Sequence, residues 1–217
     1  MTEKPRLLVD IVADPVCPWC YVGLRSFLKA KESLSESFDV LPRFRAYELN
    51  PDTPEAGADR VAYYDRKFPD KEQRAALVEA LVASAKEAGF AFDPLRPTWL
   101  PNTLKAQRVI RWAHLEGLQE AAALALYEAY WDESADLGDA AVLAAAAGNA
   151  GMNADAVREK LDSGVDRKAV RQEAAAFRQA GVSGVPTFIV NERTGFSGAL
   201  PPDRLAAALK QAAARSA

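Results

Sequence analysis

A strand that runs into a helix at a pair of cysteines constrains this fold more than any other feature. Residues 6–14, RLLVDIVAD, are rich in leucine and β-branched residues and predict a buried strand. The segment that begins at Cys17, CPWCYVGLRSFLKAKESL, then places its apolar residues at helical spacing. Both cysteines of the chain, Cys17 and Cys20, are therefore expected at the start of a helix that follows directly on a strand.

The outer segments of the chain predict one sheet of α/β type. Residues 38–51 return to strand character, and Pro42 within them indicates an edge position or a bulge. Two short strands are expected within residues 181–200, joined by a turn at Asn191 to Gly195, and a final helix carries proline in its first turn. Because βαβ units make parallel strand pairs, we expect the first two strands to be parallel.

Between about residues 57 and 181 the composition becomes alanine-rich and predicts packed helices. One helix is expected to begin after Asp70 and to end at Gly89, and the next to begin at Asn102 or Thr103. Four further helices are expected within 118–131, 139–151, 153–164 and 165–180. We therefore predict a sheet domain, residues 1–56 plus 177–217, interrupted by a helical insertion at 57–176.

Charge and composition exclude several classes of function. The net charge is −3 and no basic patch is present, so nucleic-acid binding is not expected. No segment reaches the roughly 18 uninterrupted apolar residues of a membrane span, so membrane association is not expected. The first apolar run is too short and too acidic for a signal peptide. We expect a cytoplasmic protein, in which thiols stay reduced and a purely structural disulfide would be a poor explanation of the cysteines.

A zinc site is also a poor explanation of the two cysteines. A structural zinc ion takes four ligands, commonly two cysteine pairs or one pair with two histidines. This chain has no third cysteine, and its one histidine, His114, lies far along the sequence in a predicted helix. No metal site is therefore expected.

Redox chemistry fits the cysteine pair better. At the mouth of a helix the free N–H groups and the dipole favour a thiolate, so Cys17 is expected to be the reactive, exposed nucleophile. Cys20 lies one turn later and can close a disulfide with it. Pro18 suits the first helical turn, where its missing N–H costs nothing.

Four motifs together resemble the DsbA-like branch of the thioredoxin superfamily, and most closely its cytoplasmic FrnE-type subgroup. They are DPVCPWCYVG (14–23), YELNP (47–51), PNTLKAQR (101–108) and GVSGVPTFIVNERTGFSGAL (181–200). The resemblance covers the whole chain, including the insertion. It implies a thioredoxin-like fold and a thiol–disulfide oxidoreductase in which Cys17 attacks, Cys20 resolves and Pro186 is a cis-proline. The second cysteine pair that some FrnE-type proteins carry is absent here, so an activity that needs a second redox centre is not expected.

The resemblance implies partners of a particular kind. They are protein or small-molecule thiols and disulfides, with glutathione as a possible co-substrate, and the amphipathic insertion leaves room for a homodimer. A glutathione-dependent isomerase or transferase, of the kappa or 2-hydroxychromene-2-carboxylate isomerase type, is the main alternative. Those enzymes usually carry serine at the position of Cys17, so two retained cysteines argue against it. A thiol-switched binding protein or holdase is a third alternative.

Other residues near the motifs have two interpretations each. Pro18 and Trp19 lie where a substrate would contact the helix start, although the Trp19 ring could equally pack on that helix. Val185 and Pro186 could merely begin a strand. In a thioredoxin-like arrangement their peptide bond is cis and the backbone of Val185 pairs with an extended substrate. Asn102 is expected to cap a helix or to contact substrate or glutathione.

Two carboxylates are candidates for a proton relay to Cys20. Asp14 stands three residues before Cys17, where an Asp-Pro turn is the simpler interpretation. Asp10 is the rival, because burial would raise the pKa of its carboxyl group toward neutrality. A set of aromatic residues is expected to line the core of the insertion or a cleft: Tyr63, Tyr64, Phe68, Phe90, Phe92 and Trp99.

Overall fold

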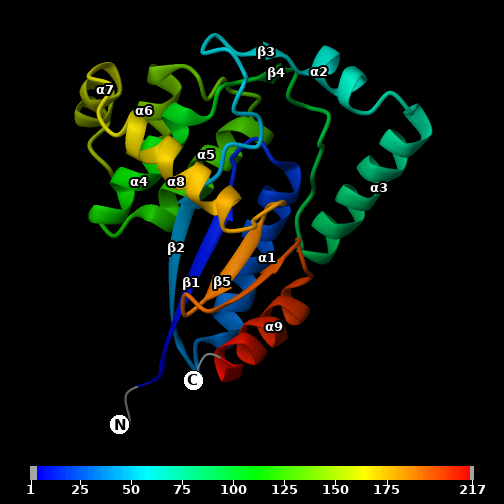
Figure 1. Cartoon of the computed structure of the whole chain (residues 1–217), viewed down its shortest axis with the longest axis vertical. Coiled ribbons are helices and arrows are strands. Elements are labelled where there is room, and N and C mark those ends of the chain that lie inside the picture. Colours follow the sequence, from blue (N-terminus) through cyan, green and yellow to red (C-terminus); the bar gives the residue numbers. More distant parts are fainter. Residues whose placement is uncertain (1–3, 216–217) are drawn as a thin grey trace.

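A computed structural model describes residues 4–215, and a four-stranded sheet forms its centre (Figure 1). The strands are β1 (Arg6–Ala13), β2 (Asp39–Ala46), β5 (Thr187–Val190) and β6 (Thr194–Ser197), in the order β2-β1-β5-β6. β1 pairs in parallel with β2 and antiparallel with β5, and β6 pairs antiparallel with β5. The predicted parallel pair is confirmed.

The turn between β5 and β6 is shorter than the sequence predicts. Gly195 lies inside β6, and the turn comprises Asn191, Glu192 and Arg193. Asn191 and Glu192 both have positive φ angles, of 49° and 61°. The side chain of Asn191 also accepts a hydrogen bond from the amide of Leu8, so the turn is fixed to β1.

Helices α1 (Pro18–Leu34) and α9 (Pro202–Arg215) pack together on one face of the sheet (Figure 1). The rings of Phe27 in α1 and Phe188 in β5 stack with centroids 6.2 Å apart. Tyr21, Leu24 and Phe27 are buried, as the helical spacing predicts. The cysteine-bearing helix is therefore anchored on the sheet along its length.

The segment between β2 and β5 is largely helical. Its helices are α2 (Arg60–Lys67), α3 (Lys71–Glu87), α4 (Leu104–Leu115), α5 (Gln119–Trp131), α6 (Ala140–Asn149), α7 (Ala154–Asp162) and α8 (Arg167–Gln179). The structure adds a short ribbon of β3 (Ala58–Asp59) and β4 (Trp99–Leu100), which periodicity could not predict because each strand has two residues. The predicted domain boundary at residues 176 and 177 falls inside α8, and the division into two domains stays a prediction.

Two predicted helix starts are explained by their capping contacts. The side chain of Asp70 accepts hydrogen bonds from the amides of Glu72 and Gln73 at the start of α3. At the start of α4 the N-cap residue is Thr103, and the side chain of Asn102 accepts from the amide of Leu104 at 3.1 Å. Both polar residues therefore satisfy amides that an isolated helix end leaves free.

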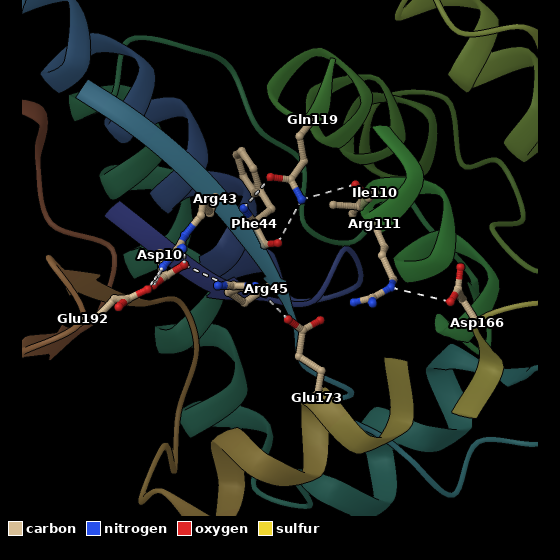
Figure 2. Close-up of polar contacts among 10 residues, drawn as sticks. All are labelled: Asp10, Arg43, Phe44, Arg45, Ile110, Arg111, Gln119, Asp166, Glu173 and Glu192. Carbon is tan, nitrogen blue, oxygen red and sulfur yellow. Dashed lines mark hydrogen bonds and ion pairs between the residues drawn. The ribbon is translucent and has the colours of Figure 1, made fainter. Parts of the chain in front are cut away.

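β2 lies at the edge of the sheet, in agreement with Pro42, and the side chain of Gln119 covers part of that edge (Figure 2). The amide of Phe44 donates to Oε1 of Gln119 at 2.9 Å, and Nε2 of Gln119 donates to the carbonyl of Phe44 at 3.0 Å. The side-chain amide thus replaces a neighbouring strand at this residue. Within residues 4–215, no helix combines the length and apolar character needed to cross a bilayer.

Candidate functional site

Cys17 is the N-cap residue of α1, with φ −84° and ψ 117°, and Pro18 is the first helical residue. The carbonyl of Cys17 accepts hydrogen bonds from the amides of Cys20 and Tyr21, at 3.0 and 3.2 Å. Both cysteines are free thiols. The sequence therefore placed the pair correctly at the mouth of the helix.

The expectation that Cys17 is exposed is wrong, because only 4% of the residue is accessible and Cys20 is 1% accessible. The segment before β5 provides part of this cover. The sulfur of Cys17 lies 3.7 Å from the carbonyl oxygen of Val185, and the Val185–Pro186 peptide bond is cis. Residues far apart in the sequence meet at the sulfur, and this long-range packing is not visible in the local pattern.

Gly23 allows the close approach of α1 to Pro186. A Cβ atom on Gly23 would lie 2.7 Å from Cγ of Pro186, nearer than real Cβ contacts come. A glycine inside a helix lowers helix stability, so its presence here has a packing reason. Gly23 is a site residue that the sequence analysis did not single out, although it ends the motif DPVCPWCYVG.

Cys20 lies deeper than Cys17 and is held as a neutral thiol. Burial, followed by the neighbouring Cys17 side chain, raises the pKa of the Cys20 thiol well above its usual value. The backbone of Asp14 acts in the opposite direction by hydrogen bonding to Cys20. Cys20 can act as a nucleophile only if a nearby group takes its proton.

Asp14 is fully buried beside this thiol. Its oxygens accept hydrogen bonds from the amide of Leu49 at 2.6 Å and from the amide of Val16 at 3.3 Å. Burial raises the pKa of the Asp14 carboxyl group to about 7, although these two amides and the Thr103 side chain partly oppose the effect. The Asp-Pro turn and a titrating carboxylate are thus both present at this residue.

Asp10, the rival carboxylate, lies in a different environment (Figure 2). Its two oxygens pair with Nη2 of Arg43 at 2.6 Å and with Nε of Arg45 at 2.7 Å. Successive side chains of a strand alternate between faces, so Asp10 points away from the face on which Val9 and Ile11 pack. Only Asp14 among the two relay candidates lies next to the cysteines. Asp10 is the centre of an ion-pair cluster, which continues to Glu192 and Glu173.

The remaining predicted residues differ in burial and in hydrogen bonding. Pro18 and Pro186 are buried, while Trp19 and Val185 are half-buried and pack against the core. The side-chain amide of Asn102 donates to the carbonyl of Thr53 at 2.7 Å, and its oxygen caps α4. Its predicted contact with substrate stays a prediction. The sole histidine, His114, is exposed near the end of α4.

Three further residues at the site come from the helical insertion. Gln107 in α4 donates to the carbonyls of Ala13 and Tyr47, which joins the end of β1 to the loop that holds Asp14. Trp131 in α5 donates to the carbonyl of Pro15 at 2.9 Å. Arg60 is 5% exposed, donates to the carbonyls of Pro94 and Pro97, and stacks over Trp131. Trp131 and Arg60 lie outside the four motifs. Gln107 lies inside PNTLKAQR (101–108), but only the packing of α4 brings it to the site.

No group of three or more histidine, cysteine, aspartate or glutamate side chains suited to a metal ion occurs within the described part of the chain. The side chains that meet at the site are two thiols, one carboxyl group whose pKa is about 7 and the surrounding hydrogen-bond donors.

A family model of the DSBA-like thioredoxin domain matches residues 8–210, which include the sheet, the cysteines and the insertion. The chain belongs to this family. The thioredoxin-like fold and the DsbA-like resemblance expected from the sequence are confirmed. Because the family match runs through the insertion, the helical segment is part of the family's own architecture.

Solved structures agree with this assignment. The chain is similar to a probable DsbA oxidoreductase from Streptomyces coelicolor, at 28% identity and a TM-score of 0.84, with 96% of this chain and 91% of that chain covered. A 2-hydroxychromene-2-carboxylate isomerase shares the fold at 18% identity and a TM-score of 0.70, covering 96% and 95%. The cytosolic disulfide reductase DsbM from Pseudomonas aeruginosa, solved with GSH, shares it at 19% identity and a TM-score of 0.66, covering 94% and 98%.

Proposed function

We propose that this DsbA-like protein is a thiol–disulfide oxidoreductase that works through Cys17 and Cys20. One observation carries the proposal: two neighbouring free thiols at the start of α1 lie beside a buried carboxyl group whose pKa is about 7. A binding protein would have no need of a titrating group next to a thiol. An exchange enzyme needs one, because each turnover moves protons as well as electrons.

In the reductive direction the Cys17 thiolate attacks one sulfur of a substrate disulfide. The substrate S–S bond breaks, a mixed disulfide forms on Cys17, and the first substrate thiolate leaves and takes up a proton. The N-terminal end of α1 supports the anion on Cys17 through its dipole. The carbonyl of Val185, 3.7 Å from the sulfur, marks the side on which an extended substrate backbone would pair with the protein.

Cys20 completes the exchange by attacking the sulfur of Cys17. The Asp14 carboxylate accepts the Cys20 proton, the new Cys17–Cys20 bond forms, and the second substrate thiolate leaves. The substrate gains two electrons and the protein loses two. With a pKa of about 7, Asp14 is partly ionised near neutral pH and can take or return this proton. Run backwards, the same steps oxidise a substrate dithiol.

A trapping experiment tests the assignment of the two roles. Cys20→Ser keeps the attacking thiol but removes the resolving one, so incubation with oxidised glutathione should leave a stable adduct of one glutathione on Cys17, visible by mass spectrometry. Cys17→Ser is the matched control and should accumulate little adduct, because the raised pKa of the Cys20 thiol keeps it protonated. Equal adduct formation on both variants would contradict the assignment.

Glutathione is the co-substrate that we propose for recycling, in which two molecules reduce the Cys17–Cys20 disulfide and leave as glutathione disulfide. The fold shared with DsbM, solved with GSH, supports this choice. The isomerase alternative requires glutathione to bind without reacting with Cys17. Binding measured by calorimetry that survives Cys17→Ser would favour that alternative. A FrnE-type activity, a cytoplasmic location and a homodimer stay predictions.

A further inference from the structure

The hydroxyl group of Tyr127 is a buried polar group that the steps above do not use. Tyr127 lies in α5 and is 1% exposed. Among residues 4–215, its hydroxyl has no hydrogen-bond partner at ordinary length and angle. A buried hydroxyl without a partner costs free energy, and native proteins retain few of them, so this one requires an explanation.

Three contacts between α5 and the segment 15–25 fix Tyr127 against the cysteine helix. The rings of Tyr21 and Tyr127 stack with centroids 5.8 Å apart and planes 10° apart. On either side of this stack, Trp131 donates to the carbonyl of Pro15 at 2.9 Å, and Arg25 pairs with Glu128 at 2.9 Å. The ring therefore has little freedom to turn its hydroxyl toward another partner.

The groups that surround the hydroxyl are those of the redox site. Burial comes first among the causes that raise the pKa of Tyr127 well above its usual value, followed by the charges of Cys20, Cys17 and Asp14. The last cause is hydrogen bonding to the Cys20 side chain, whose geometry falls short of an ordinary hydrogen bond. The hydroxyl consequently keeps its proton at any pH at which the exchange runs. It is a permanent donor beside two sulfurs that change their charge.

We propose that Tyr127 is a further catalytic residue, whose hydroxyl donates a hydrogen bond to the sulfur of Cys20 when that sulfur becomes a thiolate. This inference rests on the proposed exchange function. A neutral thiol is a weak acceptor, whereas a thiolate is a charged and much stronger one. The hydroxyl thus gains a full hydrogen bond only after Asp14 has taken the Cys20 proton. The proton of Tyr127 itself is shared and not transferred.

A second buried hydroxyl provides a matched control. The hydroxyl of Ser26 in α1 is likewise fully buried and without a partner in the described structure. Ser26 lies six positions after Cys20 along α1, whereas the Cys20 and Cys17 thiols are among the groups that act on Tyr127. If an unpaired hydroxyl matters only for packing, Tyr127→Phe and Ser26→Ala should behave alike. If the proposal holds, only Tyr127→Phe should alter thiol chemistry.

The test uses 5,5′-dithiobis(2-nitrobenzoate) as the disulfide, so no natural substrate is needed. Attack by Cys17 releases a first equivalent of thionitrobenzoate, and attack by Cys20 on the mixed disulfide releases a second. For Tyr127→Phe we expect the first release to be unchanged. The second should slow about tenfold near neutral pH, with its pH midpoint about one unit higher, which is the effect of losing one hydrogen bond to a charged group. Ser26→Ala should match the wild type in both releases.

The outcomes are distinguishable. A Tyr127→Phe protein whose second release matches the wild type in rate and pH midpoint overturns the inference and leaves the exchange function intact. Equal slowing of both releases, together with a lower melting temperature, assigns Tyr127 a packing role and also overturns it. If the variant has a lower melting temperature, the rates are measured at a temperature at which it is folded. The ratio of the second release rate to the first then distinguishes a catalytic role, which lowers the ratio, from a packing role, which leaves it unchanged. A wild type that releases only one equivalent overturns both the inference and the proposed function.

Discussion

The sulfur of Cys17 and the carbonyl oxygen of Val185 lie 3.7 Å apart, although 168 positions separate the two residues in the sequence. This contact joins the first turn of α1 to the segment before β5, and it covers the sulfur on one side. Because Gly23 lets Pro186 approach α1, the position of Val185 depends on a residue that has no chemistry of its own.

Gly23→Ala should disturb this contact. The new Cβ would lie 2.7 Å from Cγ of Pro186, a ring that is buried and cannot rotate away. We expect a loss of about 1–3 kcal/mol in the free energy of unfolding, measured in urea, and slower thiol exchange. Gly148→Ala in α6 is the control, since its Cβ would lie 3.4 Å from the Cβ of Ala154 and nothing nearer. It should be neutral or stabilising by up to about 1 kcal/mol. Equal behaviour of the two variants would contradict the packing argument.

Asp14 should make the protein less stable as the pH rises. Its pKa is raised from the usual 3.8 to about 7, so the folded protein binds this proton more tightly than the unfolded chain does. The stabilising contribution of the protonated form is complete below about pH 4 and is lost by about pH 7, with a magnitude on the order of 4 kcal/mol. Above about pH 7 the titration of Asp14 causes no further change in the free energy of unfolding.

Comparing Asp14→Asn with the wild type separates the pH dependence of stability caused by Asp14 from that caused by other carboxylates. The difference in unfolding free energy between variant and wild type should grow from about pH 4 to about pH 7, where the variant is more stable by roughly 2–4 kcal/mol. The second release of thionitrobenzoate should nevertheless slow, because the amide cannot accept the Cys20 proton. A variant less stable than the wild type at neutral pH would show that Asp14 is stabilised as an anion, against this prediction.

Asp10→Asn should have the opposite effect on stability. Asp10 is 4% exposed, and removal of its charge leaves the guanidinium groups of Arg43 and Arg45 without their shared acceptor. We expect a loss of about 2–4 kcal/mol in unfolding free energy at neutral pH. Both thionitrobenzoate releases should keep their wild-type rates, because the ion-pair cluster faces away from the cysteines. A change in the second release alone would indicate that Asp10 also accepts the Cys20 proton.

Gln119→Leu should weaken the edge of the sheet. The substitution keeps an apolar stem of similar size but leaves the buried amide and carbonyl of Phe44 without the partners that Gln119 supplies at 2.9 and 3.0 Å. Each unsatisfied backbone group costs about 1–3 kcal/mol, so a clear fall in melting temperature is expected. Amide hydrogen exchange at Phe44 should accelerate in the variant, whereas unchanged protection there would contradict the contact.

The sequence predicts those parts of the fold that depend on local pattern. The strand before Cys17, the helix after it and the cap at Asp70 each have their signal within a few neighbouring residues, and the structure contains all three. The burial of Cys17 and the separation of Asp10 from Asp14 depend on contacts between distant segments. Arg43 and Arg45 neutralise Asp10 from another strand, and no spacing along β1 predicts that pairing.

Tyr127 is another residue whose position at the site the local sequence pattern could not predict. In the segment QEAAALALYEAYW it is one aromatic residue among several, and helical spacing predicts only that it is buried. Its position beside Cys20 depends on how α5 packs against α1, through Trp131 and Arg25. Family motifs located the cysteines and Asp14, whereas Tyr127 and Trp131 are contributed by the helical segment.

A redox titration measures whether Cys17 and Cys20 exchange electrons as a pair. The wild type is equilibrated with mixtures of reduced and oxidised glutathione and quenched with an alkylating reagent, and its thiols are counted by mass spectrometry. We expect a single transition in which both thiols disappear together and form the Cys17–Cys20 disulfide, with no such transition in Cys17→Ser or Cys20→Ser. If both thiols stay reduced under strongly oxidising mixtures, or if each carries its own glutathione, the two cysteines are not an exchange pair and the proposed function is wrong.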